Sequence, residues 1–229
     1  MAAIRLADYL SAPAEDTLAA TRYAELEHLE LAEFLGAWGH IHEEARLRIR
    51  YRIHPTAFIH PTAQIGDDVI IGPHAKVHEF SSVRKNTVIA ARASIGFNCE
   101  VTHSYVGEGA VLGHRIGINR SLIGGDAHLS AAVTIAAIHP SPDMRTPVRE
   151  VLLRTADGLY RCGTAQFGAL IGDRVQTGNS ITLGPGVAIG PDSLINTGVI
   201  VPATRVLPAH STVSTPHATV LHVRQRRAL

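Results

Sequence analysis

The chain has 229 residues with a formal net charge of +1, 45% hydrophobic and 18% charged residues, and two cysteines. A nearly neutral charge gives no electrostatic basis for a nucleic-acid or membrane partner, and no Cys/His spacing indicates a disulfide scaffold or a zinc site. No signal peptide or long apolar segment is evident, so a cytoplasmic location is expected. The composition is typical of one elongated domain with a short appendage.

Residues 1–52 show no internal repeat. The segment Ser11-Ala-Pro-Ala-Glu resembles a helix start, and residues 21–35 mix apolar and acidic side chains in a pattern that predicts an amphipathic helix ending near Gly36. We expect this region, with Trp38, to form a helical cap over the open N-terminal end of the repeat that follows, because the end coil of a solenoid exposes apolar edges. A helix that binds a partner or braces a trimer is the alternative.

From Ile53 to Pro140 the sequence repeats every six residues. A period of six does not match a helix or a helix-pair repeat, and it predicts an all-β parallel β-helix in which three short strands close a coil of about eighteen residues. Two units, Val101–Tyr105 and Ile118–Leu122, are one residue short. Each unit opens with an aliphatic residue, and a second small or apolar residue follows four places later: Val69, Ala75, Ser81, Thr87, Ala93, Cys99, Ala110, Ala127 and Val133.

The repeat stops after His139 and resumes at Gly168, which leaves 141–167 as one long inserted loop. Two β-prone runs on either side of Asp157-Gly158 predict a β-hairpin within it. The β-helix then continues to residue 213, and Arg205 on an inward position indicates that it closes there; 214–229 form a C-terminal tail rich in arginine. The loop has four arginines that either meet an anionic ligand or face solvent: Arg145, Arg149, Arg154 and Arg161.

Motifs within the repeat resemble a known family. They are Phe80-Ser-Ser-Val-Arg84, Ile95-Gly-Phe-Asn-Cys-Glu-Val101, a run that ends in Gly113-His114, and Phe167-Gly-Ala-Leu-Ile-Gly-Asp. With the two shortened units, they are similar to the C-terminal acetyltransferase domain of the bifunctional glucosamine-1-phosphate acetyltransferase/N-acetylglucosamine-1-phosphate uridylyltransferase and to its archaeal sugar-1-phosphate relatives.

The resemblance covers about residues 53–213 and implies a left-handed β-helix, an exception to the usual right-handed crossover. It also implies a homotrimer. The uridylyltransferase half has no counterpart here, because the chain has no Gly-rich nucleotide loop and residues 1–52 are too few to hold that domain.

The resemblance implies a general base, His114, because a neutral imidazole can accept a proton from an attacking amine near neutral pH. It matches Arg84 to a phosphate-contacting arginine. Acetyl-CoA, or another acyl-CoA, is the implied co-substrate, with contacts expected at Ala131, Asn179 and Thr197. Other histidines on nearby coils are secondary candidates for the base: His103, His128 and His139.

The acceptor positions depart from the family. Thr102 replaces a lysine, Gly117 a tyrosine, His128 an asparagine, and Ala137-Ile138 an Asn-Tyr pair. Glucosamine 1-phosphate is therefore not the expected acceptor. We expect a small-molecule acceptor such as another amino sugar, a sugar phosphate, a nucleotide sugar or a similar small amine.

Three functions remain open on the sequence alone. The first is a CoA-dependent acyltransferase, most simply an N-acetyltransferase. The second is a sugar O-acyltransferase that uses the same base, and the third is a non-catalytic trimerisation or binding module. A carbonic-anhydrase-like enzyme would need a set of metal-binding histidines that the spacing does not offer, so no metal is expected.

Overall fold

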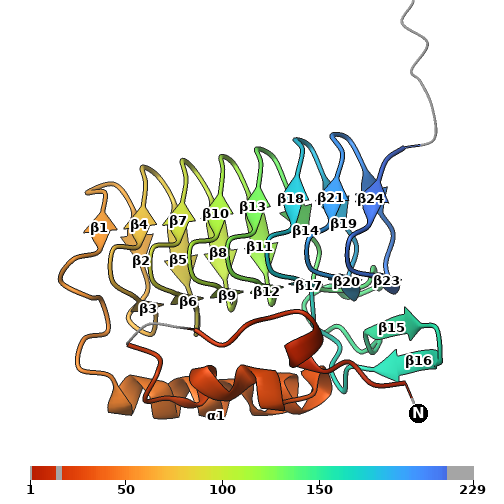
Figure 1. Cartoon of the computed structure of the whole chain (residues 1–229), viewed down its shortest axis with the longest axis horizontal. Helices are drawn as coiled ribbons and strands as arrows, with labels where there is room; N and C mark the ends of the chain where they lie inside the picture. Colours follow the sequence, from red (N-terminus) through yellow and green to blue (C-terminus); the bar gives the residue numbers. More distant parts are fainter. Residues whose placement is uncertain (1, 14–16, 216–229) are drawn as a thin grey trace, which may run out of the picture.

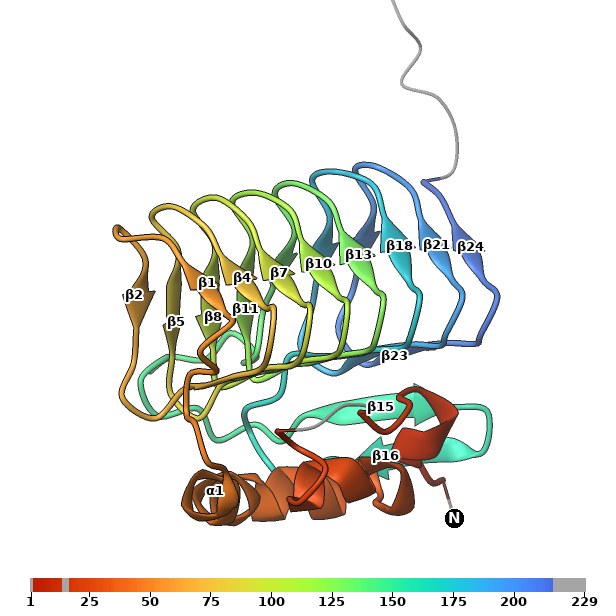
Figure 2. The same ribbon diagram turned by 60° about the vertical axis from the view of Figure 1, so that its left-hand side comes forward.

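The computed structural model describes residues 2–13 and 17–215. Residues 53–215 wind into a left-handed parallel β-helix of triangular section, which confirms the predicted fold (Figures 1 and 2). Three parallel sheets form the faces of the prism. Each coil contributes one strand to each sheet, and that strand pairs with its counterparts on the coils before and after it. We name these sheets the first, second and third face in the order in which the chain enters them.

The first face is an eight-stranded sheet of β1 (Phe58–Ile59), β4 (Lys76–Val77), β7 (Ser94–Ile95), β10 (Val111–Leu112), β13 (His128–Leu129), β18 (Gln176–Thr177), β21 (Leu194–Ile195) and β24 (Thr212–Val213). The second face consists of β2 (Gln64–Ile65), β5 (Ser82–Arg84), β8 (Glu100–Thr102), β11 (Gly117–Asn119), β14 (Thr134–Ile135), β19 (Thr182–Leu183) and β22 (Ile200–Val201). The third face consists of β3 (Ile70–Ile71), β6 (Val88–Ile89), β9 (Tyr105–Val106), β12 (Leu122–Ile123), β17 (Ala169–Ile171), β20 (Val187–Ile189) and β23 (Arg205–Leu207).

The interior of the prism is filled by the aliphatic residues that open each repeat. The strand register places aliphatic residues of successive coils next to one another, as in Val77 beside Ile95 and Val83 beside Val101. The small residues four places later, Cys99 among them, are also buried, as predicted. At many corners one residue takes a left-handed backbone conformation, which turns the chain sharply between faces: Phe80 (φ 58°), Asn98 (φ 54°) and Arg115 (φ 54°) are examples.

The inserted loop contains the predicted hairpin. Strands β15 (Leu152–Thr155) and β16 (Gly158–Arg161) pair in antiparallel register, with Leu153 opposite Tyr160. Leu153 and Tyr160 are buried, and they extend an apolar cluster that covers the third face of the prism. The hairpin is therefore part of the packed structure.

The N-terminal region covers a flank of the prism, so the expected cap over its open N-terminal end is wrong. Helix α1 (Leu31–Arg48) runs along the prism below the third face (Figures 1 and 2). The ring of Tyr23 stacks on Tyr105 of β9 with ring centroids 5.8 Å apart. The physical reason is that the third face has apolar residues pointing outward as well as inward, such as Ile70 and Leu122, and these need a cover.

The helix boundaries also differ from the prediction. Two short 3₁₀ helices, η1 (Leu6–Asp8) and η2 (Arg22–His28), precede α1, which passes through Gly36 to Arg48. A methyl group added at Gly36 would meet nothing within 4 Å, so this glycine faces open space and does not end the helix. Burial of Trp38 and Ile41 on the third face outweighs the cost of a mid-helix glycine, which is about 1 kcal/mol. The expected helix start at Ser11 extends into residues 14–16, outside the described part.

The β-helix ends at β24 (Thr212–Val213), as expected, but the side chain of Arg205 does not point inward. Arg205 is in register with the inward Val187, yet its side chain is exposed at the end of the prism. The chain makes one more first-face strand, β24, and the arginine-rich end of the predicted tail lies outside the described residues. Among the helices formed by residues 2–13 and 17–215, none has the length and apolar character needed to cross a membrane.

Candidate functional site

The edge between the first and second faces holds four of the predicted site residues. Each coil turns here once, and we call this edge the ridge. Four residues on successive coils lie in one column along it: His114, Ala131, Asn179 and Thr197. Backbone N–H groups donate along the column: Ala132 N, next to Ala131, donates to the His114 carbonyl oxygen over 2.9 Å, and Asn179 N donates to the side-chain Oγ1 of Thr197 over 3.2 Å. Ala131 N in turn donates to Asn179 Oδ1 over 3.1 Å.

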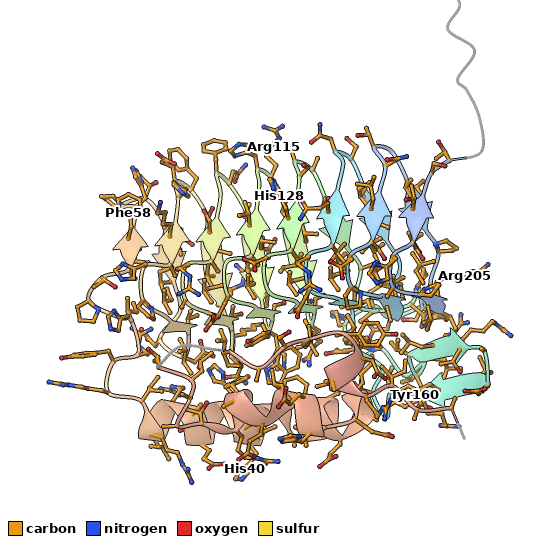
Figure 3. The ribbon with its side chains drawn as sticks, viewed as in Figure 1. His40, Phe58, Arg115, His128, Tyr160 and Arg205 are labelled. Atoms are coloured by element: carbon orange, nitrogen blue, oxygen red, sulfur yellow. The ribbon has the colours of Figure 1, made fainter. Side chains whose placement is uncertain are left out.

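His114 is exposed at the ridge, between β10 and β11. Within the described residues, no hydrogen bond or ion pair holds its imidazole. Its side chain borders a hollow of about 330 Å³ on the first face, which we call the first-face hollow. The predicted His128 lies on β13 at the same hollow, and Figure 3 shows it on the outer side of that strand. The structure therefore brings these two predicted residues together.

The floor of the first-face hollow is made of two stacked glycines. A Cβ on Gly96 would lie only 1.6 Å from the Gly113 carbonyl oxygen, so glycine is required there by the close approach of two coils. The walls include His78, Glu79 and Phe97, none of which was predicted as a site residue. The lining of the first-face hollow is more apolar than that of the neighbouring hollow on the second face, which suits an acyl or pantetheine chain.

The second face has a groove formed by two adjoining hollows of about 500 and 340 Å³. We call this the second-face groove. Its two parts share Arg84, Glu100 and Gly117 as lining residues. Arg84 donates to Ser82 Oγ over 3.1 Å and pairs with Glu100. Arg84, Thr102 and Gly117 were all predicted as acceptor-binding residues, and the structure groups them in this groove.

Thr102 is an unusual member of the groove. It lies between Arg84 and Asn119 in the strand register and is 7% exposed. Its Oγ1 has no hydrogen-bond partner among the described residues. A buried hydroxyl without a partner is costly, so this threonine is not explained by folding stability.

The predicted site residues thus divide between two faces of one chain. His114 and His128 line the first-face hollow, whereas Arg84, Thr102 and Gly117 line the second-face groove. The ridge separates these two sets within one chain. A small acceptor bound in the groove of one chain therefore does not reach the first-face hollow of the same chain.

The other candidate histidines have structural surroundings. His103 packs edge-on to Trp38 with ring centroids 4.6 Å apart, and burial lowers the pKa of His103 to about 4. His139 is buried at the start of the inserted loop, where burial and then Arg149 lower its pKa. Ala137 beside it is buried too.

Two of the four loop arginines are paired with carboxylates of the loop itself. Arg161 pairs with Glu150, and Arg145 pairs with Asp143 at 3.2 Å on the exposed surface. The described residues contain no group of three or more His, Cys, Asp or Glu side chains placed to hold a metal ion.

Comparisons with known proteins match the repeat region. A family model described as GMPPB C-terminal domain matches residues 48–146. The bifunctional sugar-1-phosphate nucleotidylyltransferase/acetyltransferase of Sulfurisphaera tokodaii is 28% identical over 121 residues, which are 53% of this chain and 29% of that protein. The carnitine operon protein CaiE of Escherichia coli is 36% identical over 84 residues, which are 33% of this chain and 42% of that protein. The chain therefore matches less than half the length of each of these relatives.

The matched solved structures are more distant in sequence. A point mutant of perosamine N-acetyltransferase from Caulobacter crescentus, in complex with CoA and GDP-perosamine, is 18% identical with a TM-score of 0.35, covering 76% of this chain and 59% of its own. UDP-N-acetylglucosamine acyltransferase from Campylobacter jejuni is 20% identical with a TM-score of 0.39, covering 71% of this chain and 67% of its own. The sequence matches agree with the resemblance carried by the motifs: over part of its length this chain is similar to a sugar-1-phosphate nucleotidylyltransferase/acetyltransferase.

Proposed function

We propose that this protein transfers an acyl group from acetyl-CoA, or another acyl-CoA, to the amine of a sugar-derived acceptor. One observation carries the proposal: the exposed imidazole of His114 heads the ridge column of Ala131, Asn179 and Thr197, beside the apolar first-face hollow. The relative named as a bifunctional sugar-1-phosphate nucleotidylyltransferase/acetyltransferase supports it. A cytoplasmic location and a reaction without a metal remain predictions.

The proposed chemistry follows from what the ridge offers. As the acceptor nitrogen attacks the thioester carbonyl carbon, His114 accepts the proton that the amine loses. The tetrahedral intermediate then collapses, the C–S bond breaks, and the CoA thiolate leaves with the electron pair and takes up a proton. Asn179 Oδ1 is engaged by Ala131 N, so its amide NH₂ remains able to donate to a pantetheine carbonyl lying along the column.

We further propose that the working site lies between copies of the chain. His114 and Arg84 face different hollows on either side of the ridge. A second copy that places its second-face groove against the first-face hollow would bring both residues to one acceptor. Three copies related by a three-fold axis repeat this contact in a closed ring, which is the predicted homotrimer.

Mixed oligomers test both proposals together. Thiol release from acetyl-CoA is measured with a panel of amino sugars, sugar phosphates and nucleotide sugars, for the wild type, His114→Ala, Arg84→Ala and the two variants co-expressed. If each site takes His114 from one copy and Arg84 from another, random mixing restores an intact site at roughly a quarter of the interfaces. Activity of co-expressed chains no higher than that of the single variants would contradict the shared site. Unchanged turnover in His114→Ala would remove the proposed base.

A further inference from the structure

Gly117 stands at the centre of the second-face groove without a backbone reason for being glycine. It lies in β11, outside the left-handed region, and an added Cβ would meet nothing within 4 Å. Glycine weakens a strand by about 0.5–1 kcal/mol relative to alanine. Gly96 and Gly113 show the contrast, since a Cβ on either would meet backbone atoms of the next coil at 3.1 Å or closer. The absence of a side chain at Gly117 leaves open the space that joins the two hollows into one groove.

The hollow nearer the ridge has a planar wall. Phe80 lines it and is 60% exposed, and its ring meets that of Phe97 edge-on at a centroid distance of 5.8 Å. Phe80 occupies the left-handed corner position (φ 58°), where a bulky residue is unfavourable. The coils that follow place other residues at this corner: Asn98, Arg115, Ala132, Ser180 and Gly198. Folding alone does not explain an exposed aromatic ring here.

The same hollow offers hydrogen-bonding groups beside the ring. Gln64 and Asn98 line it, and neither side-chain amide is bonded to another described residue. An amide group both donates and accepts, which matches the mixed donors and acceptors on the edge of a nucleobase. An aromatic face with amides at its rim is a stacking site for a planar heterocycle.

The other part of the groove is suited to phosphate and sugar. Arg84 lies where the two hollows meet, and Lys85 and Thr102 line the second hollow. Two cationic groups in sequence along the groove suit a pyrophosphate better than a single neutral sugar. Each hollow by itself has a volume in the range of small-molecule sites, so a monosaccharide phosphate would leave one of them empty.

We propose that the second-face groove binds a nucleoside diphosphate-linked acceptor, with the base stacked on Phe80, the pyrophosphate at Arg84 and Lys85, and the sugar beside Thr102. The identification of the bound molecule as the acyl acceptor rests on the proposed function. The binding itself does not, because it involves no turnover. An adenine nucleotide of CoA shares the same chemistry and is the competing source of a base at Phe80.

Calorimetric titration of the full chain separates these possibilities. The probes are UDP, GDP, dTDP, CoA and glucosamine 1-phosphate, and the proteins are the wild type, Phe80→Ala, Gly117→Tyr and a matched control, Phe58→Ala. Phe58 is 48% exposed but lies on the first face, outside the groove. We expect at least one of the three nucleoside diphosphates to bind the wild type and the control equally. Phe80→Ala should weaken that binding about five- to a hundredfold, and Gly117→Tyr should abolish it.

Other outcomes overturn the inference. It fails if none of the three diphosphates binds at millimolar concentration, if Phe80→Ala binds them as the wild type does, or if CoA is the ligand whose affinity depends on Phe80. Circular dichroism and size-exclusion chromatography of each variant show that a loss of binding is not a loss of fold or assembly. Thiol release is measured separately, so nucleotide binding without acyl transfer would contradict the proposed function and leave the groove assignment standing.

Discussion

The third face and the two open faces are built from the same six-residue repeat and differ in what lies on them. On the third face α1 and the hairpin bury the outward side chains, and a chain of hydrogen bonds crosses the contact: Trp38 Nε1 donates to Tyr23 Oη over 3.2 Å, and Tyr23 Oη lies 3.0 Å from His42 Nδ1. His42 Nε2 lies 2.6 Å from the Asp68 carbonyl oxygen, so the imidazole joins the helix to the prism. On the other two faces the outward side chains meet solvent and form the hollows.

This difference separates structural from functional histidines. His42 and His103 are held between the N-terminal region and the prism, where each is surrounded by apolar groups and burial lowers its pKa. His114 and His128 face solvent beside an open hollow. Substitutions on the covered face should therefore change stability, and substitutions at the ridge should change activity alone.

The largest expected effect belongs to His114→Ala. Loss of a general base lowers turnover about 10²- to 10⁴-fold, whereas removal of an exposed side chain changes the unfolding free energy by less than about 0.5 kcal/mol. Thiol release and urea unfolding are measured on the same preparations. His74→Ala is the matched control, because His74 is also an exposed corner histidine but lies on a different edge. A destabilised His114→Ala protein would mean that the open ridge is structural after all.

Trp38→Ala should have the largest effect on stability. Trp38 is 2% exposed, and its ring packs on Phe34 with centroids 4.8 Å apart and edge-on against His103. Removal of a buried aromatic side chain costs about 3–5 kcal/mol. It also takes away a hydrogen bond donated to Tyr23. The measurement is urea unfolding, with the exposed Phe58→Ala as control, and equal midpoints for the two variants would show that the N-terminal cover contributes little to stability.

A smaller effect is expected in the pH dependence of the unfolding free energy, which should differ between a histidine under the N-terminal cover and an exposed one. Burial lowers the pKa of His103 to about 4, with Arg120, His42 and Lys85 acting in the same direction and Asp68 against them. The unfolded chain binds that proton near pH 6.5, so this contribution to stability is complete above about pH 6.5 and is lost as the pH falls toward 4.

We expect the wild type to lose unfolding free energy between pH 7 and pH 4.5, and His103→Gln to lose less over the same range. The exposed His74→Gln should follow the wild type. Parallel curves for the wild type and His103→Gln would show that the covered histidine has no influence on the acid side of the stability profile.

The repeat made the prism predictable because its period reports the coil directly. The inward positions other than Arg205, the shortened units and the hairpin around Asp157-Gly158 follow from local sequence. The position of the N-terminal region depends on a contact far along the chain, and the expectation of an end cap was wrong. A signal for it was present, since third-face strands such as Ile70–Ile71 and Leu122–Ile123 are apolar at both positions, which indicates burial on both sides.

The candidate site was predictable in part. The motif that ends in His114 located an exposed ridge residue, and Arg84, Thr102 and Gly117 share one groove. Spacing along the chain did not reveal that this groove and the His114 hollow lie on different faces, because residues three apart around a corner point in different directions. Phe80 and Phe97 were not identified as site residues, although aromatic residues at turn positions that usually hold small or polar residues are a readable signal.

Only a small effect on stability is expected for Glu100→Gln, on the open second face. Glu100 pairs with Arg84, but the two side chains are 59% and 46% exposed, and such pairs contribute no more than about 1 kcal/mol. The substitution releases the Arg84 guanidinium for an anionic ligand and removes a carboxylate that repels one, so nucleoside diphosphates should bind more tightly. Asp192→Asn is the matched control, because it breaks the exposed Arg174–Asp192 pair at 2.7 Å on another edge and should leave that affinity unchanged. Weaker binding by Glu100→Gln would instead mean that the carboxylate itself contacts the ligand, and the groove would then select a cationic group at that point.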